Sequence, residues 1–544
     1  MVARVVPGVL PAALCILTAL RILTALRIPT ALRIPTALLL PTALLLQGLT
    51  PAPASAFCGF YVSGADGSLY NDATMVVMMR EGRRTVLSMQ NSYQGPPEDF
   101  AMVIPVPAIL QEENVKTLPR EVFERVDQLA APRLVEYWEQ DPCDQRHLIE
   151  YQRDFSRAVD IEETEEEDRD LGVTVEAEFA VGEYDVVILS ASDSSGLDTW
   201  LRRESYNIPT GANDVLRPYV EAGTKFFVAK VDVERVELEN GRAVLSPLRV
   251  HYDTDEFSLP VRLGLLNSTG QQDLLVHILS RGTRYEVANY PNATIPTNIR
   301  VVDAVRDEFG AFYDALFDRT LREKPGSVIT EYAWDASSCD PCPTPALTPP
   351  ELQLLGADTI GGGAGFVLTR LHYRYRADDL GEDLVFRTAP PIVGGRGMPD
   401  AQGELREVGA QESGSINNFQ GRYVILHPFE GVLACENPVR GAWGGPPHGA
   451  TPPPQAARSP LVGARGRAEL GVLVAEDIPE INVVQGEAPA NVPAARVIDE
   501  GPPPAPASGG CASCNVGSGV GGFGGTSVVF LAVAYLWWRR RNKA

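Results

Sequence analysis

Histidine and recognised catalytic motifs are scarce in this chain of 544 residues. The sequence contains neither the G-x-S-x-G motif of serine hydrolases nor the H-E-x-x-H motif of zinc proteases. A hydrolytic site would have to be assembled from residues far apart in the chain, for example His251 or His427 with Asp253. No catalytic residue is therefore predicted. The six histidines are His147, His251, His277, His372, His427 and His448.

Basic residues are few relative to acidic ones, and they are unevenly distributed. Residues 1–56 hold four arginines and no acid, and residues 511–544 hold three arginines, one lysine and no acid. Residues 57–510 therefore contain 39 basic residues against 70 acidic ones, a net charge of −31. Such a body should be soluble, and nucleic acid and anionic lipid should repel it. Nucleic-acid binding is the function that this charge disfavours most.

Cysteine is also uncommon, with eight residues in the whole chain. Cys15 lies near the N-terminus and Cys511 and Cys514 near the C-terminus, which leaves an odd number in the body. By spacing alone, the CDPC motif at 339–342 could be half of a zinc site or a redox pair. A zinc site would need a second pair of ligands, and none is nearby. A redox pair lies at a strand-to-helix turn, whereas the prolines here indicate an irregular loop. We expect structural disulfides, no metal and no cofactor; the pairing stays open. The candidate disulfide residues are Cys58, Cys143, Cys339, Cys342 and Cys435.

Two segments superficially match ligand-binding loops. GGGAGF at 361–366 lacks the Lys-Ser/Thr of a phosphate loop, and a strand-like run follows it where a helix would be needed. IEETEEEDRD at 161–170 carries seven acids, but it lacks the alternating ligands and the glycine of a calcium loop. The first segment is read as a flexible turn and the second as a solvated connector.

The first 56 residues have the pattern of an export leader. They contain a six-residue repeat (ILTALR, ILTALR, IPTALR) whose prolines match neither a helix nor a strand period. An apolar run then leads to Ala54-Ser55-Ala56, in which Ala54 and Ala56 form the small-x-small pattern that a signal peptidase requires. Cleavage would make Phe57 the first residue. Cys58 would suit lipid attachment only if a small residue preceded it.

The body that follows is predicted to be α+β, strand-rich and mostly antiparallel, with a few helices. Apolar runs at 73–79 and 84–90 around Gly82 predict a hairpin, and their lack of alternation indicates burial on both faces. Apolar residues at helical spacing predict helices over 119–132 and 309–321.

The acidic connector divides this body into two predicted lobes. We expect an N-terminal lobe at 57–160, a linker at 161–172 and a second α+β lobe at 173–438. Residues 439–510 are rich in proline, glycine and alanine, and we expect them to form an extended stalk with one further element near 467–483.

Residues 511–544 have the composition of a membrane anchor or sorting tag. The uncharged segment Val520–Trp538 would span roughly 28 Å as a helix, about the thickness of a bilayer's hydrocarbon core. Basic residues after it indicate a cytoplasmic end. Its most apolar part, 528–538, is short, so a processed sorting tag is favoured over a permanent span. The processing and sorting residues would be Cys511, Cys514, Arg539, Arg540 and Arg541.

Four stretches of the body carry a family resemblance. They are FCGFYVSGADGSLYNDATMVVMMREGRRTVLSMQNSYQGPPEDFAMVIPVP, LDTWLRRESYNIPTGANDVLRPYVEAGTKFFVAKVD, YEVANY and EYAWDASSCDPCPTPAL. Together they resemble the bacterial domain of unknown function 2330 family, over roughly residues 57–435. The tail resembles the MYXO-CTERM sorting signal, with a cysteine motif, a hydrophobic helix and an arginine cluster. The first resemblance implies an exported bacterial protein and no reaction, and the second implies processing near the cysteines and delivery to the outer cell surface.

These observations favour an exported, surface-anchored and non-enzymatic ectodomain that binds or scaffolds. Its partners would be the export and C-terminal sorting machinery, the membrane through its tail, and an unidentified extracellular partner. A secreted hydrolase with a site assembled from distant residues is the alternative, and a calcium-stabilised adhesin is a third hypothesis. A deep pocket that joins a nucleophile, a histidine and an acid would favour the hydrolase.

Overall fold

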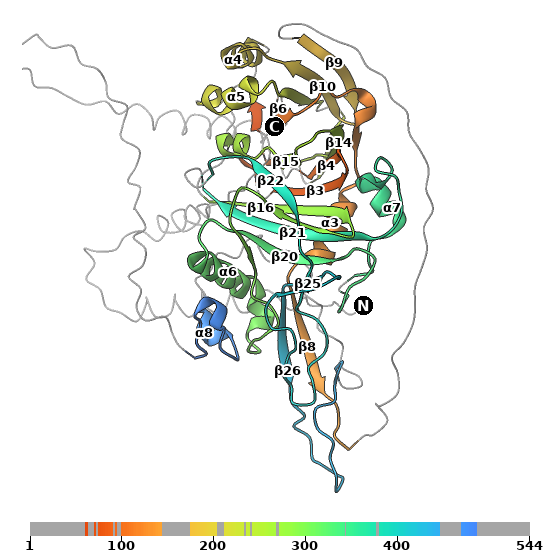
Figure 1. The fold of residues 1–544 in the computed structure, drawn as a ribbon, viewed down its shortest axis with the longest axis vertical. Helices are drawn as coiled ribbons and strands as arrows, with labels where there is room; N and C mark the ends of the chain where they lie inside the picture. Colours follow the sequence, from red (N-terminus) through yellow and green to blue (C-terminus); the bar gives the residue numbers. More distant parts are fainter. Residues whose placement is uncertain are drawn as a thin grey trace, which may run out of the picture. The chain divides into compact units, whose positions relative to one another are not determined.

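Strands, most of them antiparallel to their neighbours, dominate the computed structural model (Figure 1). The structure describes residues 60–63, 70–71, 74–90, 93–94, 100–143, 174–203, 211–232, 235–239, 242–267, 271–342, 344–376, 380–446 and 469–486. All of these belong to one compact unit. Within them, no helix is both long and apolar enough to cross a membrane.

The bounds of the elements are as follows. The strands of the N-terminal part are β1 (Phe60–Ser63), β2 (Tyr70–Asn71), β3 (Thr74–Glu81), β4 (Arg84–Gln90), β5 (Tyr93–Gln94), β6 (Phe100–Val106), β7 (Val115–Thr117) and β8 (Arg133–Glu139). The middle strands are β9 (Thr174–Val181), β10 (Tyr184–Ser190), β11 (Lys225–Val231), β12 (Glu237–Glu239), β13 (Arg242–Val244), β14 (Leu248–Asp253), β15 (Ser258–Leu259), β16 (Gln272–Arg281), β17 (Arg284–Val287), β18 (Asn292–Thr294), β19 (Ile299–Arg300) and β20 (Val328–Asp335). The last strands are β21 (Phe366–Tyr375), β22 (Leu384–Ala389), β23 (Ile392–Gly394), β24 (Gln411–Glu412), β25 (Asn418–Gln420), β26 (Arg422–His427) and β27 (Trp443–Gly444). The α-helices are α3 (Arg120–Ala130), α4 (Ser194–Arg203), α5 (Ala212–Glu221), α6 (Val305–Glu323), α7 (Pro349–Leu352) and α8 (Leu470–Leu473).

The central element is an 11-stranded sheet, as counted over the described residues. Its order is β24-β23-β25-β20-β21-β16-β3-β4-β14-β7, and β18 pairs with β20. The β3–β4 hairpin turns at Gly82, whose φ of 54° is a conformation that glycine adopts without strain. The core of β4 is buried on both faces, which confirms the prediction made from its apolar run. The strands of a sheet that is covered on both sides have continuous apolar sequences, because neither face meets water.

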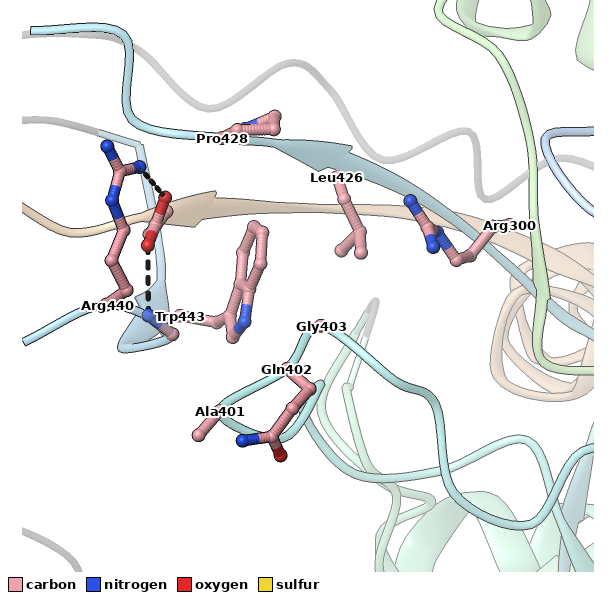
Figure 2. A pocket seen from close by; sticks show the side chains of 10 residues that line it. Arg300, Ala401, Gln402, Gly403, Leu426, Pro428, Arg440 and Trp443 are labelled. Carbon is pink, nitrogen blue, oxygen red and sulfur yellow. Dashed lines mark hydrogen bonds and ion pairs between the residues drawn. The ribbon is translucent and has the colours of Figure 1, made fainter.

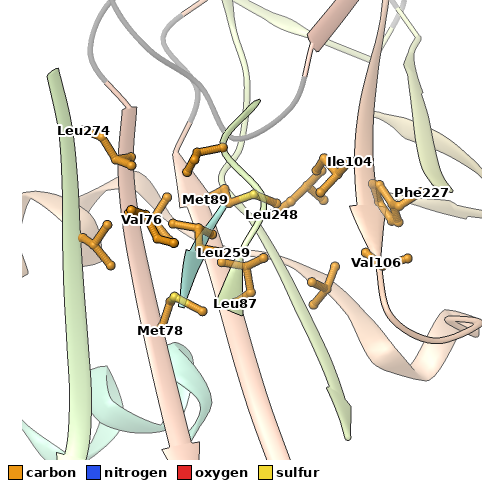
Figure 3. Close-up of a cluster of buried hydrophobic side chains, with 14 of the residues drawn as sticks. Val76, Met78, Leu87, Met89, Ile104, Val106, Phe227, Leu248, Leu259 and Leu274 are labelled. Carbon is orange, nitrogen blue, oxygen red and sulfur yellow. The ribbon is translucent and has the colours of Figure 1, made fainter. Parts of the chain in front are cut away.

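One face of this sheet packs on a five-stranded sheet of order β1-β6-β11-β10-β9. Figure 3 shows Val76, Met78, Leu87 and Met89 of the β3–β4 hairpin within this core, which also contains Phe227 of β11. Further apolar residues of β6 and β10 complete the sheet-on-sheet layer. Helices α4 and α5 bury their apolar sides against the outer face of the five-stranded sheet.

The opposite face of the 11-stranded sheet is covered by helices. Val122, Phe123 and Val126 of α3 pack with the residues of β3, β4 and β21 that point away from the first core. Helix α6 packs with β20 and β26, in a separate core that also includes α8. The charged residues described below lie on this face, beneath α3 and α6.

Several predicted elements are confirmed. The expected helices over 119–132 and 309–321 are α3 and α6, and the expected hairpin is β3–β4. Most strand pairs are antiparallel, as predicted, but β3–β16 and β8–β26 are among the parallel ones. Together these elements confirm a strand-rich α+β body.

The division into two lobes is wrong. Strands from the predicted N-terminal lobe pair directly with strands from the second: β3 with β16, β4 and β7 with β14, β6 with β11, and β8 with β26. The two segments therefore share sheets and cores. The acidic run was a misleading boundary because a cluster of charge in the sequence carries no information about which strands pair on either side of it.

The predicted stalk also needs correction where the structure describes it. Trp443 and Gly444 form β27 and pair with β8. Farther along, residues 469–486 contain α8 and pack apolar side chains into the core of α6. These buried side chains are Leu470, Leu473, Val474, Ile478, Ile481 and Val483. Apolar burial on this scale fixes a segment to the body in spite of its proline-rich flanks. The predicted hydrophobic helix at 520–538 lies outside the described residues.

Candidate functional site

A chain of alternating charges crosses the helix-covered face of the large sheet. Strand β21 supplies Arg370, His372 and Arg374 at every second position, so all three point to the same face. The intervening Leu371, Tyr373 and Tyr375 point into the opposite core. The acidic partners come from neighbouring elements: Asp127 from α3, Glu331 from β20, Asp273 from β16, and Asp314 and Asp318 from α6.

Glu331 is the centre of this network. Its carboxylate accepts hydrogen bonds from Arg370 Nε at 2.6 Å and from Tyr313 Oη at 2.5 Å, and it lies 2.8 Å from His372 Nδ1. The side chains of Glu331, Arg370 and His372 are 0% exposed. Burial alone would raise the pKa of Glu331, but His372 and Arg370 outweigh it and hold the pKa at about 2. Glu331 is therefore ionised at all ordinary pH values.

His372 is held by carboxylates at both ring nitrogens. Nδ1 is 2.8 Å from Glu331 and Nε2 is 2.8 Å from Asp273. Its ring stacks on Phe317, with the ring centroids 4.0 Å apart. Burial alone would lower the pKa of His372, but Glu331 and Asp273 raise it above the ordinary value. A neutral ring would turn a lone pair toward one carboxylate, so the imidazolium, which donates from both nitrogens, is the form that fits.

This arrangement stabilises the fold and leaves His372 unable to act as a general base. A base in acyl transfer needs one ring nitrogen free to take a proton from the nucleophile. In His372 both nitrogens already donate to carboxylates, and the ring is sealed from solvent. The network extends to the surface through Arg374, whose guanidinium pairs with Asp273, Asp314 and Asp318.

The titration of this network predicts the pH dependence of stability. The raised pKa of His372 contributes stability that is fully present below its usual value of 6.5 and is lost as pH rises through the folded-state pKa. The lowered pKa of Glu331 contributes stability present above 4.5 and lost as pH falls toward about 2. The free energy of unfolding, measured with urea, should therefore be greatest between pH 4.5 and 6.5. It should decline on the alkaline side of this range.

Two histidine variants test the alkaline limb. His372→Gln should remove the decline above pH 6.5. His251→Gln should keep it, because burial lowers the pKa of His251, so that its proton is lost below this range in the folded state. Equal alkaline slopes in the wild type and in His372→Gln would contradict the assignment.

A small pocket opens among β8, β19, β26 and β27, with a volume of about 270 Å³ (Figure 2). Its apolar lining comes from Leu426, Pro428 and Trp443. The indole nitrogen of Trp443 donates to the carbonyl oxygen of Asp400 at 2.9 Å, so the ring is fixed. Gly403 is required there: its φ is 80°, and a Cβ would lie 3.2 Å from the Trp443 ring.

Glu139 supports one end of the pocket. Its carboxylate accepts backbone N–H groups of Phe429 and Gly441, each at 2.9 Å, and pairs with Arg440 at 2.8 Å. Burial alone would raise the pKa of Glu139, but these hydrogen bonds lower it overall. The chain around Arg440 is thereby fastened to β8. Cys143 and Cys435 form a disulfide that joins the chain beyond β8 to the chain beyond β26.

The expected structural disulfides are confirmed for the residues that are described. Cys143 pairs with Cys435, and Cys339 pairs with Cys342. The CDPC motif is therefore a disulfide turn, and no group of three or more His, Cys, Asp or Glu residues able to hold a metal occurs among the described residues. The remaining predicted residues lie outside the described ranges: Ala54, Ala56, Cys58, Cys511, Cys514, Arg539, Arg540 and Arg541.

Of the residues suggested for a hydrolase, His251 and Asp253 lie two positions apart on one face of β14, but each has another hydrogen-bond partner. Asp253 pairs with Arg84 at 2.7 Å, and His251 lies 3.2 Å from the Asn114 amide. His427 lies in a different sheet, where it pairs with Glu136 at 2.6 Å and stacks on Trp138. These contacts do not form a triad.

The glycine segment at 361–366 is a turn, as predicted. The guanidinium of Arg281 donates to the carbonyl oxygens of Ile360, Gly361 and Gly362. A phosphate loop presents backbone N–H groups to its ligand, whereas this turn presents carbonyl oxygens to a cation.

The charged network was missed in the sequence, although a signal was present. FVLTRLHYRY alternates basic residues at 370, 372 and 374 with apolar ones, which is the pattern of a strand with one charged face. The acids that pair with this charged face lie roughly 40 to 240 residues away along the chain. No local pattern in the sequence connects them with the strand.

Comparison with known proteins gives one family match. The model of the family described as "Uncharacterized protein conserved in bacteria (DUF2330)" matches residues 52–387. Neither the curated proteins nor the solved structures give a match.

Proposed function

The chain belongs to the DUF2330 family of uncharacterized proteins conserved in bacteria, and from this premise we propose that it is an exported protein of the cell envelope. Its α+β body is held at the outer cell surface, where it binds an extracellular partner and catalyses no reaction. The leader with Ala54 and Ala56 supports export, and the tail from Cys511 to Arg541 supports sorting and attachment. The disulfides of the body suit an oxidising compartment.

The observation that carries the non-enzymatic assignment is the state of His372. It is the histidine that lies closest to two carboxylates in the described part of the chain, and both of its ring nitrogens are engaged. Among the other described histidines, His427 pairs with the buried Glu136, His251 lies beside the Asn114 amide, and the buried His277 lies beside Arg370. By contrast, the pocket beside Trp443 is open and has a fixed aromatic wall, which suits binding.

Protease treatment of intact cells tests the location. A non-permeating protease should digest the 57–510 body, and the mature protein should begin at Phe57 by mass determination. The double variant Cys511→Ser with Cys514→Ser should abolish sorting. The body should then be released from the cell or retained inside it, and it should no longer be found at the outer surface. Cys339→Ser with Cys342→Ser is the matched control, because it removes a cysteine pair of the same spacing type from the body and should leave sorting intact.

Two outcomes would contradict the proposal. Protection of the body in intact cells would place it inside. Covalent labelling of the purified chain by a fluorophosphonate, which reacts with activated serines, would show a hydrolytic nucleophile and restore the hydrolase hypothesis.

A further inference from the structure

Arg300 places a positive charge at one end of the pocket, and the nearest acid to act on it is the Glu476 carboxylate. Its backbone is fixed: the N–H donates to Glu476 at 2.7 Å, and β19 pairs with β26. Within the described ranges, its guanidinium makes no hydrogen bond or ion pair. Arg440, at the opposite end in Figure 2, is already paired with Glu139. The pocket thus offers a guanidinium whose five N–H donors make no recorded hydrogen bond among the described residues, and two of them can hold a carboxylate.

The middle of the pocket is apolar and narrow. Leu426 and Trp443 lie between the two arginines in Figure 2, and Pro428 extends this surface. Because the indole N–H is already used by Asp400, the ring offers a ligand only its apolar face. A volume of about 270 Å³ is just below the usual range for ligand pockets, about 300 to 1,000 Å³. It suits a single six-membered ring.

We infer that this pocket binds a carboxylate-bearing sugar ring, of the hexuronate class, as the extracellular ligand of the proposed function on which this inference rests. Arg300 pairs with the carboxylate, and the C–H face of the pyranose lies on Trp443. Gln402 and Arg440 also line the pocket and are the polar side chains that can bond the ring hydroxyls. A planar aromatic acid would fill the same space but would make no hydrogen bonds to these side chains beyond the one from its carboxylate.

The charge of the body restricts the ligand to one acidic residue. Residues 57–510 hold 39 basic against 70 acidic residues, so a long polyanion would meet repulsion beyond the pocket. At physiological salt the Debye length is about 8 Å, so a single carboxylate at Arg300 is affected mainly by its immediate neighbours. The ligand is therefore a free acidic monosaccharide or the terminal residue of a chain.

Calorimetry on the purified full chain tests this inference, with sodium D-glucuronate, D-glucose and sodium benzoate as probes. Glucuronate should bind at least 10-fold more tightly than either of the others. Arg300→Gln should weaken glucuronate binding by about 10- to 100-fold, as expected for a hydrogen bond to a charged group, and should leave the weak binding of glucose unchanged. Trp443→Ala should weaken the binding of both sugars.

A matched control and a folding control make the result decisive. Arg83→Gln removes an exposed arginine of the β3–β4 turn, 66% exposed, and should leave glucuronate binding unchanged. The unfolding midpoint of Arg300→Gln should equal that of the wild type. Equal affinity for glucuronate and glucose, or no loss in Arg300→Gln, would overturn the inference. Tighter binding of benzoate would replace the sugar with an aromatic acid. None of these results alters the location found by protease treatment, so the two proposals fail separately.

Discussion

Glu331→Gln is expected to lower the free energy of unfolding by about 3–5 kcal/mol, the usual cost of breaking a buried ion pair. The substitution keeps the size of the side chain and removes its charge. Arg370 and His372, both fully buried, then lose the carboxylate that they share. Their desolvation remains, since neither side chain can reach water. Urea unfolding followed by circular dichroism measures the loss.

Glu81→Gln is the matched control. Glu81 pairs with Arg281 at 3.2 Å on the surface, where its side chain is 46% exposed. Exposed pairs of this kind contribute about 0–1 kcal/mol, because water and salt screen them. Equal losses in Glu331→Gln and Glu81→Gln would show that the buried network contributes no more than a surface pair.

The double variant Glu331→Gln with Arg370→Met separates two causes of this loss. If the uncompensated charge of Arg370 dominates, removing that charge as well should recover part of the stability, as is common for buried pairs replaced by apolar residues. The double variant should then be more stable than Glu331→Gln alone. A further loss in the double variant would show that Arg370 stabilises the fold mainly through its other partner, Asp127, 2.5 Å away.

Local elements could be predicted from the sequence because their causes are local. The apolar residues of α3 recur at helical spacing, and Pro119 and Pro132 mark its ends, so both its existence and its limits were predictable. The β3–β4 hairpin was predictable from two apolar runs around Gly82. The prolonged apolar character of these strands also revealed that both faces are buried.

Strand partners over long distances could not be predicted. β3 pairs in parallel with β16, about 200 residues later, and β8 pairs with β26, nearly 290 residues later. Periodicity states which face of a strand is buried, but it carries no information about the strand beside it. The two-lobe prediction failed for this reason, since the acidic connector was the only local feature that could suggest a boundary.

The candidate sites show the same limit. Arg370, His372 and Arg374 mark one face of β21, but whether that face meets water or acids depends on β16, β20 and α6. The pocket depends on Arg300 and Trp443, which lie more than 140 residues apart in the sequence. Neither residue has a neighbouring motif, so only the fold brings them to one place.

The Cys143–Cys435 disulfide also joins distant parts of the chain, and for this reason we expect it to be the second large contributor to stability. The bond joins residues separated by 292 positions, whereas Cys339 and Cys342 are separated by three. A crosslink restricts the unfolded chain more strongly when it closes a longer loop. In the folded state it fastens the chain beyond β8 to the chain beyond β26, next to the hydrogen bond from Val439 to Pro142 at 2.9 Å.

Cys143→Ser with Cys435→Ser is therefore expected to lower the free energy of unfolding by about 2–5 kcal/mol, and Cys339→Ser with Cys342→Ser by less than about 2 kcal/mol. Urea unfolding of the two double variants under the same non-reducing conditions measures the difference. A reductant added to the wild type should cause a loss at least as large as that of Cys143→Ser with Cys435→Ser, because it opens both bonds. Equal losses in the two variants would contradict loop closure as the cause and would place the contribution of Cys143–Cys435 in local contacts of the folded state.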